Sequence, residues 1–419
     1  MEFLIRGAKI LDPSSPNHSL IKDILIRQGV IEKIDDTIDF NGLVIEHAHL
    51  RVSPGWFDMR SLIPDPGKEH KEDLETGAAA AAAGGFTEVM VLPNTDPVIS
   101  NKNSISYFHK WNKSATVTLH PSAAVTLGCH GKDLTEMIDL HTAGAVAFTD
   151  GTEPIWHTDI LLKSLQYLQT FDGVLINRPE DKMLTAFGTM HEGIMSTSLG
   201  MKGMPELAEE IMIDRDLELL KYAGGKIHFS LISSAGAVQR IREAKAQGLK
   251  VTADVGIHYL IFTDENLSDF DTNFKVNPPF RKEVDRQALI DGVLDGTIDV
   301  IVSDHQPHDQ ESKQLEFDLA DFGVIGFQTF YPALIKALGD KADSQLDKMI
   351  SAPRKILGFE IPMIREGEMA NLTLFSPSIE WKYNAATNQS KSVASPFINQ
   401  SLKGKVVAIV NNGNLIQHD

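Results

Sequence analysis

Through the middle of the chain, short apolar runs alternate with longer stretches whose hydrophobic positions recur with a helical period. The runs are bounded by polar residues and glycines, a pattern typical of buried parallel strands. The stretches from Leu207 to Tyr222 and from Gly236 to Gln247 are amphipathic, and glycines follow both, as at many helix C-termini. Strand alternating with helix over about 300 residues predicts a (β/α)8 barrel or a doubly wound sheet. The predicted strands are Thr87–Leu92, Ala145–Phe148, Gly173–Ile176, Ile227–Ser230, Lys250–Asp254 and Asp299–Val302.

The two ends of the chain have a different character. Segments such as Phe3–Arg6 and Asp23–Arg27 read as short strands separated by turn residues, and Ala370–Phe375 and Lys405–Val410 resemble them. We therefore expect both ends to pair in one sheet. This predicts a discontinuous small β domain (residues 1–53 plus 360–419) beside a barrel domain (54–359).

In a (β/α)8 barrel the chemistry lies at the C-terminal ends of the strands, so the residues that directly follow the apolar runs are the candidates. These residues are Arg60, Asn94, Asp150, Arg178, Leu231, His258 and Asp304. The alanine run Ala78–Ala83, followed by Gly84 and Gly85, predicts a packing helix without a chemical role.

Composition and charge exclude several classes of function. The chain has 39 Lys and Arg against 57 Asp and Glu, and a net charge of -18 should repel nucleic acid and anionic membranes. We see neither a signal peptide nor an apolar run near the ~20 residues that cross a bilayer, and so expect a cytoplasmic protein. Cys129 is the one cysteine, which excludes an internal disulfide and a multi-cysteine metal site; we expect a buried apolar residue rather than a nucleophile.

Four motifs carry a family resemblance. Together with Leu199-Gly200, Phe322-Gly323 and Gly367, and in this order and spacing, they resemble the class I dihydroorotases from about residue 3 to 410. The resemblance implies an α/β protein with a TIM-type amidohydrolase barrel, and the terminal β segments would form a small β-sandwich. It also implies two zinc ions that activate water for interconversion of carbamoyl aspartate and dihydroorotate in pyrimidine biosynthesis. The motifs are Pro54–Met59, Glu75–Thr87 with Leu92–Thr95, Lys275–Arg281 and Ser303–His308.

This sequence departs from the family at the metal ligands. Where the resemblance implies a His-x-His-x-Arg motif after the first strand, the chain has Arg60, Leu62 and Pro64. Two further ligand histidines correspond to Arg178 and Leu231. Of the six matched metal positions (Arg60, Leu62, Asp150, Arg178, Leu231 and Asp304), two carboxylates remain.

Two carboxylates do not hold a pair of zinc ions, since a guanidinium repels a cation and a leucine has no lone pair. We therefore expect no metal and no cofactor, with zinc present only if the protein uses an atypical site. We expect Arg60 and Arg178 to form ion pairs with Asp150 and Asp304 in the vacated space.

Metal loss also weighs against catalysis. Zinc lowers the pKa of water from 15.7 to about 7, so its absence costs roughly 11 to 12 kcal/mol if water must ionise. A general base typically recovers about 3 to 5 kcal/mol. Asp304 keeps the catalytic position of the family, but we expect it to be non-functional here and to pair with an arginine.

Positions that contact the substrate in the family are retained as Asn94, Asn277, His308, Phe322 and Gly323. A structural role competes at each position, because Asn94 and Asn277 lie in turns where asparagine ties down its own loop and His308 could cap the loop that Asp304 opens.

The pair His47 and His49 has the spacing of metal ligands but falls in the small β unit, with no third ligand nearby in the sequence. We expect no metal there.

Three hypotheses follow. The leading one is an inactive or impaired dihydroorotase homologue with a structural or regulatory role, either as a homo-oligomer or, by family analogy, with aspartate carbamoyltransferase. The second, from another class, is a working cyclic amide hydrolase with an atypical site. The third is a sensor that binds a small anionic ligand between Arg60 and Arg178.

Overall fold

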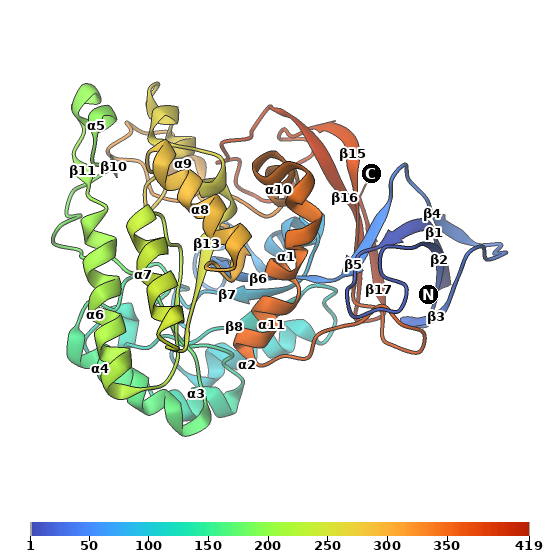
Figure 1. The fold of residues 1–419 in the computed structure, drawn as a ribbon, viewed down its shortest axis with the longest axis horizontal. Coiled ribbons are helices and arrows are strands. Elements are labelled where there is room, and N and C mark those ends of the chain that lie inside the picture. The colour runs from blue at the N-terminus through green and yellow to red at the C-terminus, as the bar shows by residue number, and fades with distance from the viewer. Residues whose placement is uncertain (1, 419) are drawn as a thin grey trace.

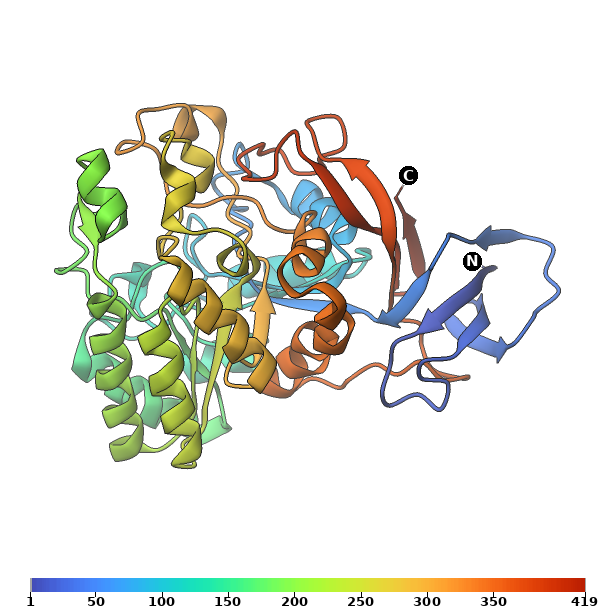
Figure 2. The ribbon, with the colours of Figure 1, turned by 45° about the horizontal axis from the view of Figure 1, so that its top comes forward.

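The computed structural model describes residues 2–418. Figures 1 and 2 show a β-rich end, built from the first and last strands of the chain, beside a larger part in which helices surround shorter strands. The larger part contains most of the buried apolar side chains, and the terminal strands enclose a second, smaller apolar cluster. The model is mixed α/β, as predicted.

Strands from both ends of the chain form one sheet. Its order is β17-β16-β15-β5-β1-β2-β3, with β4 paired to β1. The ends meet where β5 and β15 run antiparallel, with Val52 opposite Leu374. The predicted pairing of the two ends is therefore observed, while the domain limits 1–53 plus 360–419 and 54–359 stay a prediction. The strands are β1 (Glu2–Ile10), β2 (Ile21–Arg27), β3 (Val30–Asp35), β4 (Leu43–Ile45), β5 (Arg51–Pro54), β15 (Leu372–Lys382), β16 (Ser401–Asn411) and β17 (Asn414–Gln417).

The centre of the molecule holds two sheets of parallel strands, β6-β7-β8 and β9-β12-β13-β14. Isolated bridges join them through Phe148 on one side and between Ser61 and His305 on the other. The parallel strands thus follow one another in a circular order, which we call the strand ring; the closed (β/α)8 barrel remains the prediction. Its strands are β6 (Trp56–Ser61), β7 (Phe86–Val91), β8 (Thr118–Pro121), β9 (Leu175–Asn177), β12 (Ile227–Phe229), β13 (Val251–Gly256) and β14 (Val300–Val302).

One predicted strand differs in the structure. Residues 145–148 form no named strand, and Phe148 is instead bridged singly to Ala123 and to Leu175. The segment still lies between its two neighbours, since the Val146 amide donates to the Pro121 carbonyl and the Phe148 amide donates to the Val174 carbonyl. The other predicted strands of the ring and the two predicted helices are present with limits that shift by one or two residues, whereas the terminal strands β1, β15 and β16 are longer than predicted.

Helices follow most strands of the ring. Helix α1 begins at the cap Asp73, whose side chain accepts a hydrogen bond from the Thr76 amide, and its alanines lie buried, as the packing interpretation predicted. Its end is tight, since a side chain at Gly84 would lie 2.3 Å from the Phe327 carbonyl oxygen. The helices are α1 (Leu74–Ala83), α2 (Lys102–Asn112), α3 (Met137–Ala143), α4 (Thr158–Leu168), α5 (Ile194–Leu199), α6 (Leu207–Ala223), α7 (Ala235–Ala246), α8 (Glu283–Asp295), α9 (Gln310–Lys313), α10 (Phe330–Leu338) and α11 (Ser351–Leu357). Two short strands, β10 (Met190–His191) and β11 (Gly203–Met204), pair with each other between α4 and α6.

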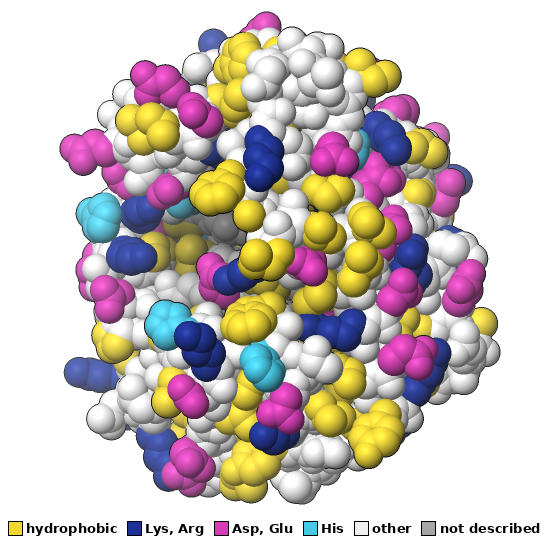
Figure 3. Space-filling view, turned by 90° about the vertical axis from the view of Figure 1, so that its left-hand side faces the viewer, with side chains coloured by type: hydrophobic (Ala, Val, Ile, Leu, Met, Phe, Trp, Pro, Cys, Tyr) yellow, Lys and Arg dark blue, Asp and Glu magenta, His cyan; other side chains and the backbone are white. Residues whose placement is uncertain are grey.

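Three expectations about composition have a structural counterpart. Within residues 2–418 no helix is long and apolar enough to cross a membrane. Cys129 is buried, as expected, and burial raises the pKa of its thiol. The face in Figure 3 intersperses basic, acidic and apolar side chains, and the expected absence of a nucleic-acid partner stays a prediction.

Candidate functional site

A cavity of about 430 Å³ lies where the strand ring ends in polar residues. Segments that directly follow β6, β7, β9 and β14 line it, as the strand-end rule predicted. It brings together seven of the residues singled out from the sequence: Arg60, Leu62, Asn94, Arg178, Asn277, His308 and Phe322. Asp150, Leu231, Asp304 and Gly323 are not among the lining residues.

Arg60 and Asp304 form a buried ion pair behind this cavity. The Arg60 Nε atom donates to the Asp304 carboxylate at 3.1 Å, and the two side chains are 1% and 3% exposed. Arg60 also donates to the Gly151 carbonyl and to the Ser230 hydroxyl, both at 3.3 Å. Burial raises the pKa of Asp304, and the Arg60 charge opposes that rise. The ion pair expected between Arg60 and Asp304 is therefore present.

Asp150 does not pair with an arginine, contrary to our expectation. Its carboxylate accepts hydrogen bonds from the Thr126 amide at 2.9 Å and from the Thr126 hydroxyl at 2.5 Å. Burial raises the pKa of Asp150 to about 6, against these hydrogen bonds. Neutral donors on the segment after β8 therefore satisfy the carboxylate.

Arg178 also differs from the expectation, because it pairs with neither Asp150 nor Asp304. It forms an ion pair with Glu180, two residues along the chain, and donates to the Thr152 carbonyl at 2.8 and 3.0 Å. Burial would raise the pKa of Glu180, but Arg178 and Thr185 outweigh it and the pKa is lowered. Arg178 therefore pairs with Glu180 on its own loop rather than with an aspartate across the ring.

The backbone of Leu231 has a conformation that is unfavourable for leucine. Its φ is 56°, in the left-handed region that bulky side chains rarely adopt and that histidine tolerates better. The Asp254 carboxylate holds this turn by accepting from the Leu231 amide at 2.7 Å and from the Ser230 hydroxyl at 2.8 Å. The turn suits the histidine that the resemblance implies at this position.

These residues do not fit a pair of zinc ions. The matched positions offer two carboxylates, two guanidinium groups and two leucines, and one carboxylate is already bound to Arg60. Among residues 2–418, no three His, Cys, Asp or Glu side chains gather in a way that could hold a metal ion.

The retained asparagines have structural partners. Asn94 donates to the Asp150 carbonyl at 3.0 Å and accepts from the Thr152 amide at 2.9 Å, so it clamps a neighbouring loop. Asn277 donates to Glu180 at 3.2 Å. Both contact other loops rather than tying down their own turns, and their side chains still line the cavity.

His308 ties together the loops on the opposite side of the cavity. Its Nε2 lies 2.8 Å from the Phe322 carbonyl oxygen and its Nδ1 lies 3.1 Å from Lys71. Gly323 has a φ of 121°, and a side chain there would lie 2.9 Å from the His308 ring. The retained Phe322-Gly323 pair therefore allows a close approach of this loop to His308.

Lys313 holds the Phe322-Gly323 loop from below. Its ammonium donates to the Asp321 carbonyl at 2.9 Å and to the Gly323 carbonyl at 3.0 Å. Burial, with a contribution from Lys275, lowers the pKa of Lys313 to about 7. The ammonium is thus close to losing its proton at neutral pH.

This lowered pKa predicts that stability rises with pH above 7. Between pH 7 and about 10 the unfolded chain retains a proton that the folded chain has lost, which gives a slope of at most about 1.4 kcal/mol per pH unit. We expect Lys313→Gln to flatten denaturation midpoints measured between pH 7 and 9.5. Lys110→Gln on the exposed face of α2 should keep the slope, and an unchanged slope in Lys313→Gln would contradict the assignment.

Most of the charged side chains at the cavity were not predicted from the sequence. Lys68 and Lys71 come from the loop after β6, and Lys71 contacts Asp321 at 3.0 Å. Lys182 pairs with Glu153 across the opening. The charged run from Lys68 to Glu72 was the available signal, but a charged loop alone predicts only exposure.

The histidines His47, His49 and His258 do not line the cavity. His47 and His49 are exposed and belong to a turn after β4 rather than to one face of a strand. His258 is buried near Phe397, and burial lowers its pKa to about 4.

Known proteins match this chain along its whole length. A family model described as Dihydro-orotase-like matches residues 50–237. A dihydroorotase of Acetivibrio thermocellus is 40% identical and one of Geobacter sp. (strain M21) 37% identical, with at least 98% of each chain covered. The chain belongs to the dihydroorotase family. The fold is also that of L-hydantoinase from Arthrobacter aurescens, with a TM-score of 0.85 at 21% identity, covering 99% of this chain and 96% of that one.

Proposed function

We propose that this chain is a dihydroorotase-family protein of pyrimidine biosynthesis that lacks the two-zinc centre and the hydrolytic activity, and that it acts as a structural or regulatory partner. The observation that carries the proposal is the Arg60 guanidinium, which lies at a family ligand position and pairs with the buried Asp304. A fixed positive charge at that point repels a divalent cation and neutralises a carboxylate that a metal would need.

The position of Asp304 supports the same conclusion for chemistry without a metal. Its carboxylate accepts from Arg60 and, at 2.7 Å, from the Gln306 amide, and it is not among the lining residues of the cavity. A general base must come within hydrogen-bond reach of the proton that it takes. The carboxylate-binding arginine that the resemblance implies is Pro64 here, which removes a contact for substrate.

Exposed apolar side chains support a role as a partner. Met183, Phe187 and Ile194 are 85%, 89% and 84% exposed. Apolar side chains on one short segment of surface are typical of places that another protein covers. By family analogy we propose aspartate carbamoyltransferase or a second copy of this chain as that partner.

The second candidate is an active dihydroorotase with an atypical site. The names of the curated relatives, at 37% and 40% identity over almost the whole chain, favour this candidate. It requires a nucleophile activated by groups other than the six matched positions.

The third candidate is a sensor of small anions. Five cationic and three acidic side chains line the cavity, which favours an anionic ligand. Arg60, Arg178 and Lys71 are held by Asp304, Glu180 and Asp321, so Lys68 would meet an anion first. This candidate and the leading one are compatible.

Zinc analysis and a cyclisation assay with carbamoyl aspartate separate the first two candidates. After expression with added zinc, we expect less than about 0.1 zinc per chain and no turnover above buffer, because the ligands are missing. An enzyme chosen from the relatives, purified in parallel, is the positive control. Stoichiometric zinc or enzymic turnover would refute the leading proposal, and failure to co-elute with aspartate carbamoyltransferase would refute that choice of partner.

A further inference from the structure

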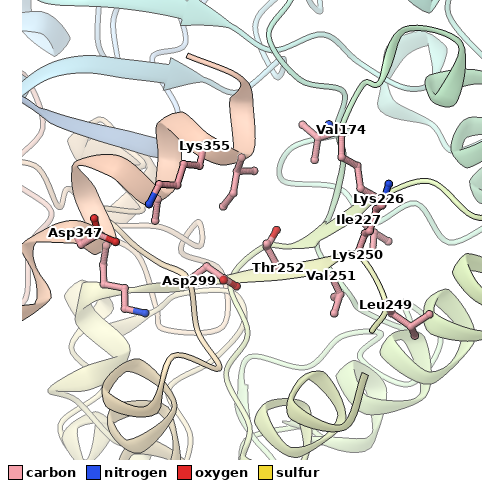
Figure 4. A pocket seen from close by; sticks show the side chains of 13 residues that line it. Val174, Lys226, Ile227, Leu249, Lys250, Val251, Thr252, Asp299, Asp347 and Lys355 are labelled. Carbon is pink, nitrogen blue, oxygen red and sulfur yellow. The ribbon is translucent and has the colours of Figure 1, made fainter. Parts of the chain in front are cut away.

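A second cavity, of about 470 Å³, lies at the opposite end of the strand ring. The residues directly before β12 and β13, Lys226 and Lys250, lie on one side of it. Residues of the 3₁₀ segment Gly339–Met349 and of α11 lie on the other side, as Figure 4 shows for Asp347 and Lys355. The hydantoinase-like fold places the candidate catalytic cavity at the other strand ends, so this cavity is separate from it.

Four lysines line this cavity in a chain whose net charge is -18. Lys226 pairs with Asp172 at 2.9 Å, and Lys348 donates to the Ile298 carbonyl at 2.6 Å. Lys250 and Lys355 have no side-chain hydrogen bond or ion pair with any residue between 2 and 418. Two ammonium groups are thus available to a ligand.

The acidic residues of the cavity do not cancel this charge. Asp299 is bound by Lys245 through both oxygens, at 2.7 and 2.8 Å, and also accepts from the Ala253 amide. Asp347 remains as the second lining carboxylate. Burial lowers the pKa of Lys348, so further negative charge beside it would stabilise its protonated form.

The rest of the wall is apolar. Ile227, Leu249 and Val251 contribute from the strand side, and Ala352 and Ile356 from α11. Thr252 is a polar residue of the cavity wall. Its hydroxyl already has a hydrogen-bond partner, since it lies 2.8 Å from the buried Nδ1 of His228. A ligand would therefore meet lysines at the rim and apolar side chains below them.

We propose that this cavity binds an organic diphosphate, such as a nucleoside diphosphate, with its phosphates between Lys250 and Lys355. The apolar part would lie against Ala352 and Ile356 of α11, which are partly exposed. Lysine binds phosphate as a point charge, and a diphosphate carries enough charge to engage several ammonium groups at once. An apolar wall of this kind contributes to binding through the area that it removes from water. This site is independent of the proposed function at the other cavity.

Isothermal titration calorimetry of the full chain with ADP, pyrophosphate and adenosine tests the proposal. We expect ADP to bind with a Kd below about 1 mM, and pyrophosphate and adenosine each to bind about tenfold or more weakly. Equal affinity for ADP and pyrophosphate would overturn the assignment of the apolar wall. Absence of ADP binding would overturn the site.

Charge-reversal variants locate the binding. We expect Lys250→Glu with Lys355→Glu to weaken ADP binding by about tenfold or more. We expect Lys110→Glu with Lys113→Glu, at the C-terminal end of α2 and directly after it, to leave binding within about twofold. All four lysines are exposed, so the two variants carry the same charge change without disturbing the core. Equal weakening by both variants would show general charge attraction and overturn the proposal. Zinc content and cyclisation are measured on the same samples, so failure here is distinguishable from failure of the proposed function.

Discussion

Replacing Arg60 by methionine is expected to destabilise the protein by about 3 to 5 kcal/mol at pH 8, because it leaves the Asp304 carboxylate buried without its partner. The deficit should be smaller at pH 5. Burial already raises the pKa of Asp304, and loss of the guanidinium raises it further, so the folded variant takes up a proton that the unfolded chain does not hold at that pH. Chemical denaturation at both pH values measures the difference.

Adding Asp304→Asn to Arg60→Met should restore most of the loss, since the amide needs no counter-charge and asparagine tolerates the φ of 47° at this position. Arg242→Met, which breaks an exposed pair with Asp295, is the control and should cost at most about 1 kcal/mol. If Arg60→Met lowered the free energy of unfolding by no more than Arg242→Met does, the ion pair between Arg60 and Asp304 would not stabilise the site.

Restoring four histidines is expected to restore metal binding. The variant with Arg60, Leu62, Arg178 and Leu231 each changed to histidine supplies imidazoles at the positions that the family resemblance assigns to zinc ligands. It should bind about two zinc ions per chain by elemental analysis, against less than about 0.1 for the unchanged chain. The left-handed backbone of residue 231 favours this outcome, because histidine is better suited to it than leucine.

The same four-histidine chain with Asp150→Ala is the control, and its zinc content should fall to about one or less, since it loses a carboxylate ligand. A four-histidine chain that folds but binds no zinc would contradict the view that these four substitutions removed the centre. We expect no dihydroorotase activity from it, because Pro64 still stands in place of the arginine that the resemblance implies for substrate.

Periodicity predicted the local elements well. The helices at Leu207–Ala223 and Ala235–Ala246 and most strands of the ring were predicted to within one or two residues, because their apolar positions fix which side is buried. The predicted strand at 145–148 is present only as single bridges at Phe148 and backbone hydrogen bonds to both neighbours, and period alone does not show how far its pairing extends. Pairing between the two ends of the chain was expected because both contain short strand-like segments. The register between β5 and β15 was not predicted.

The chemistry of four side chains is a property of the sequence by itself, since Arg60, Leu62, Arg178 and Leu231 cannot act as zinc ligands wherever they lie. How the charges were then neutralised was decided by the tertiary structure. Arg60 forms an ion pair with Asp304 across the ring, whereas Arg178 forms one with Glu180 on its own loop. The Asp150 carboxylate accepts a hydrogen bond from the Thr126 amide instead. Pairing depends on distances of a few ångströms between segments far apart in the chain, and residue type and spacing do not contain those distances.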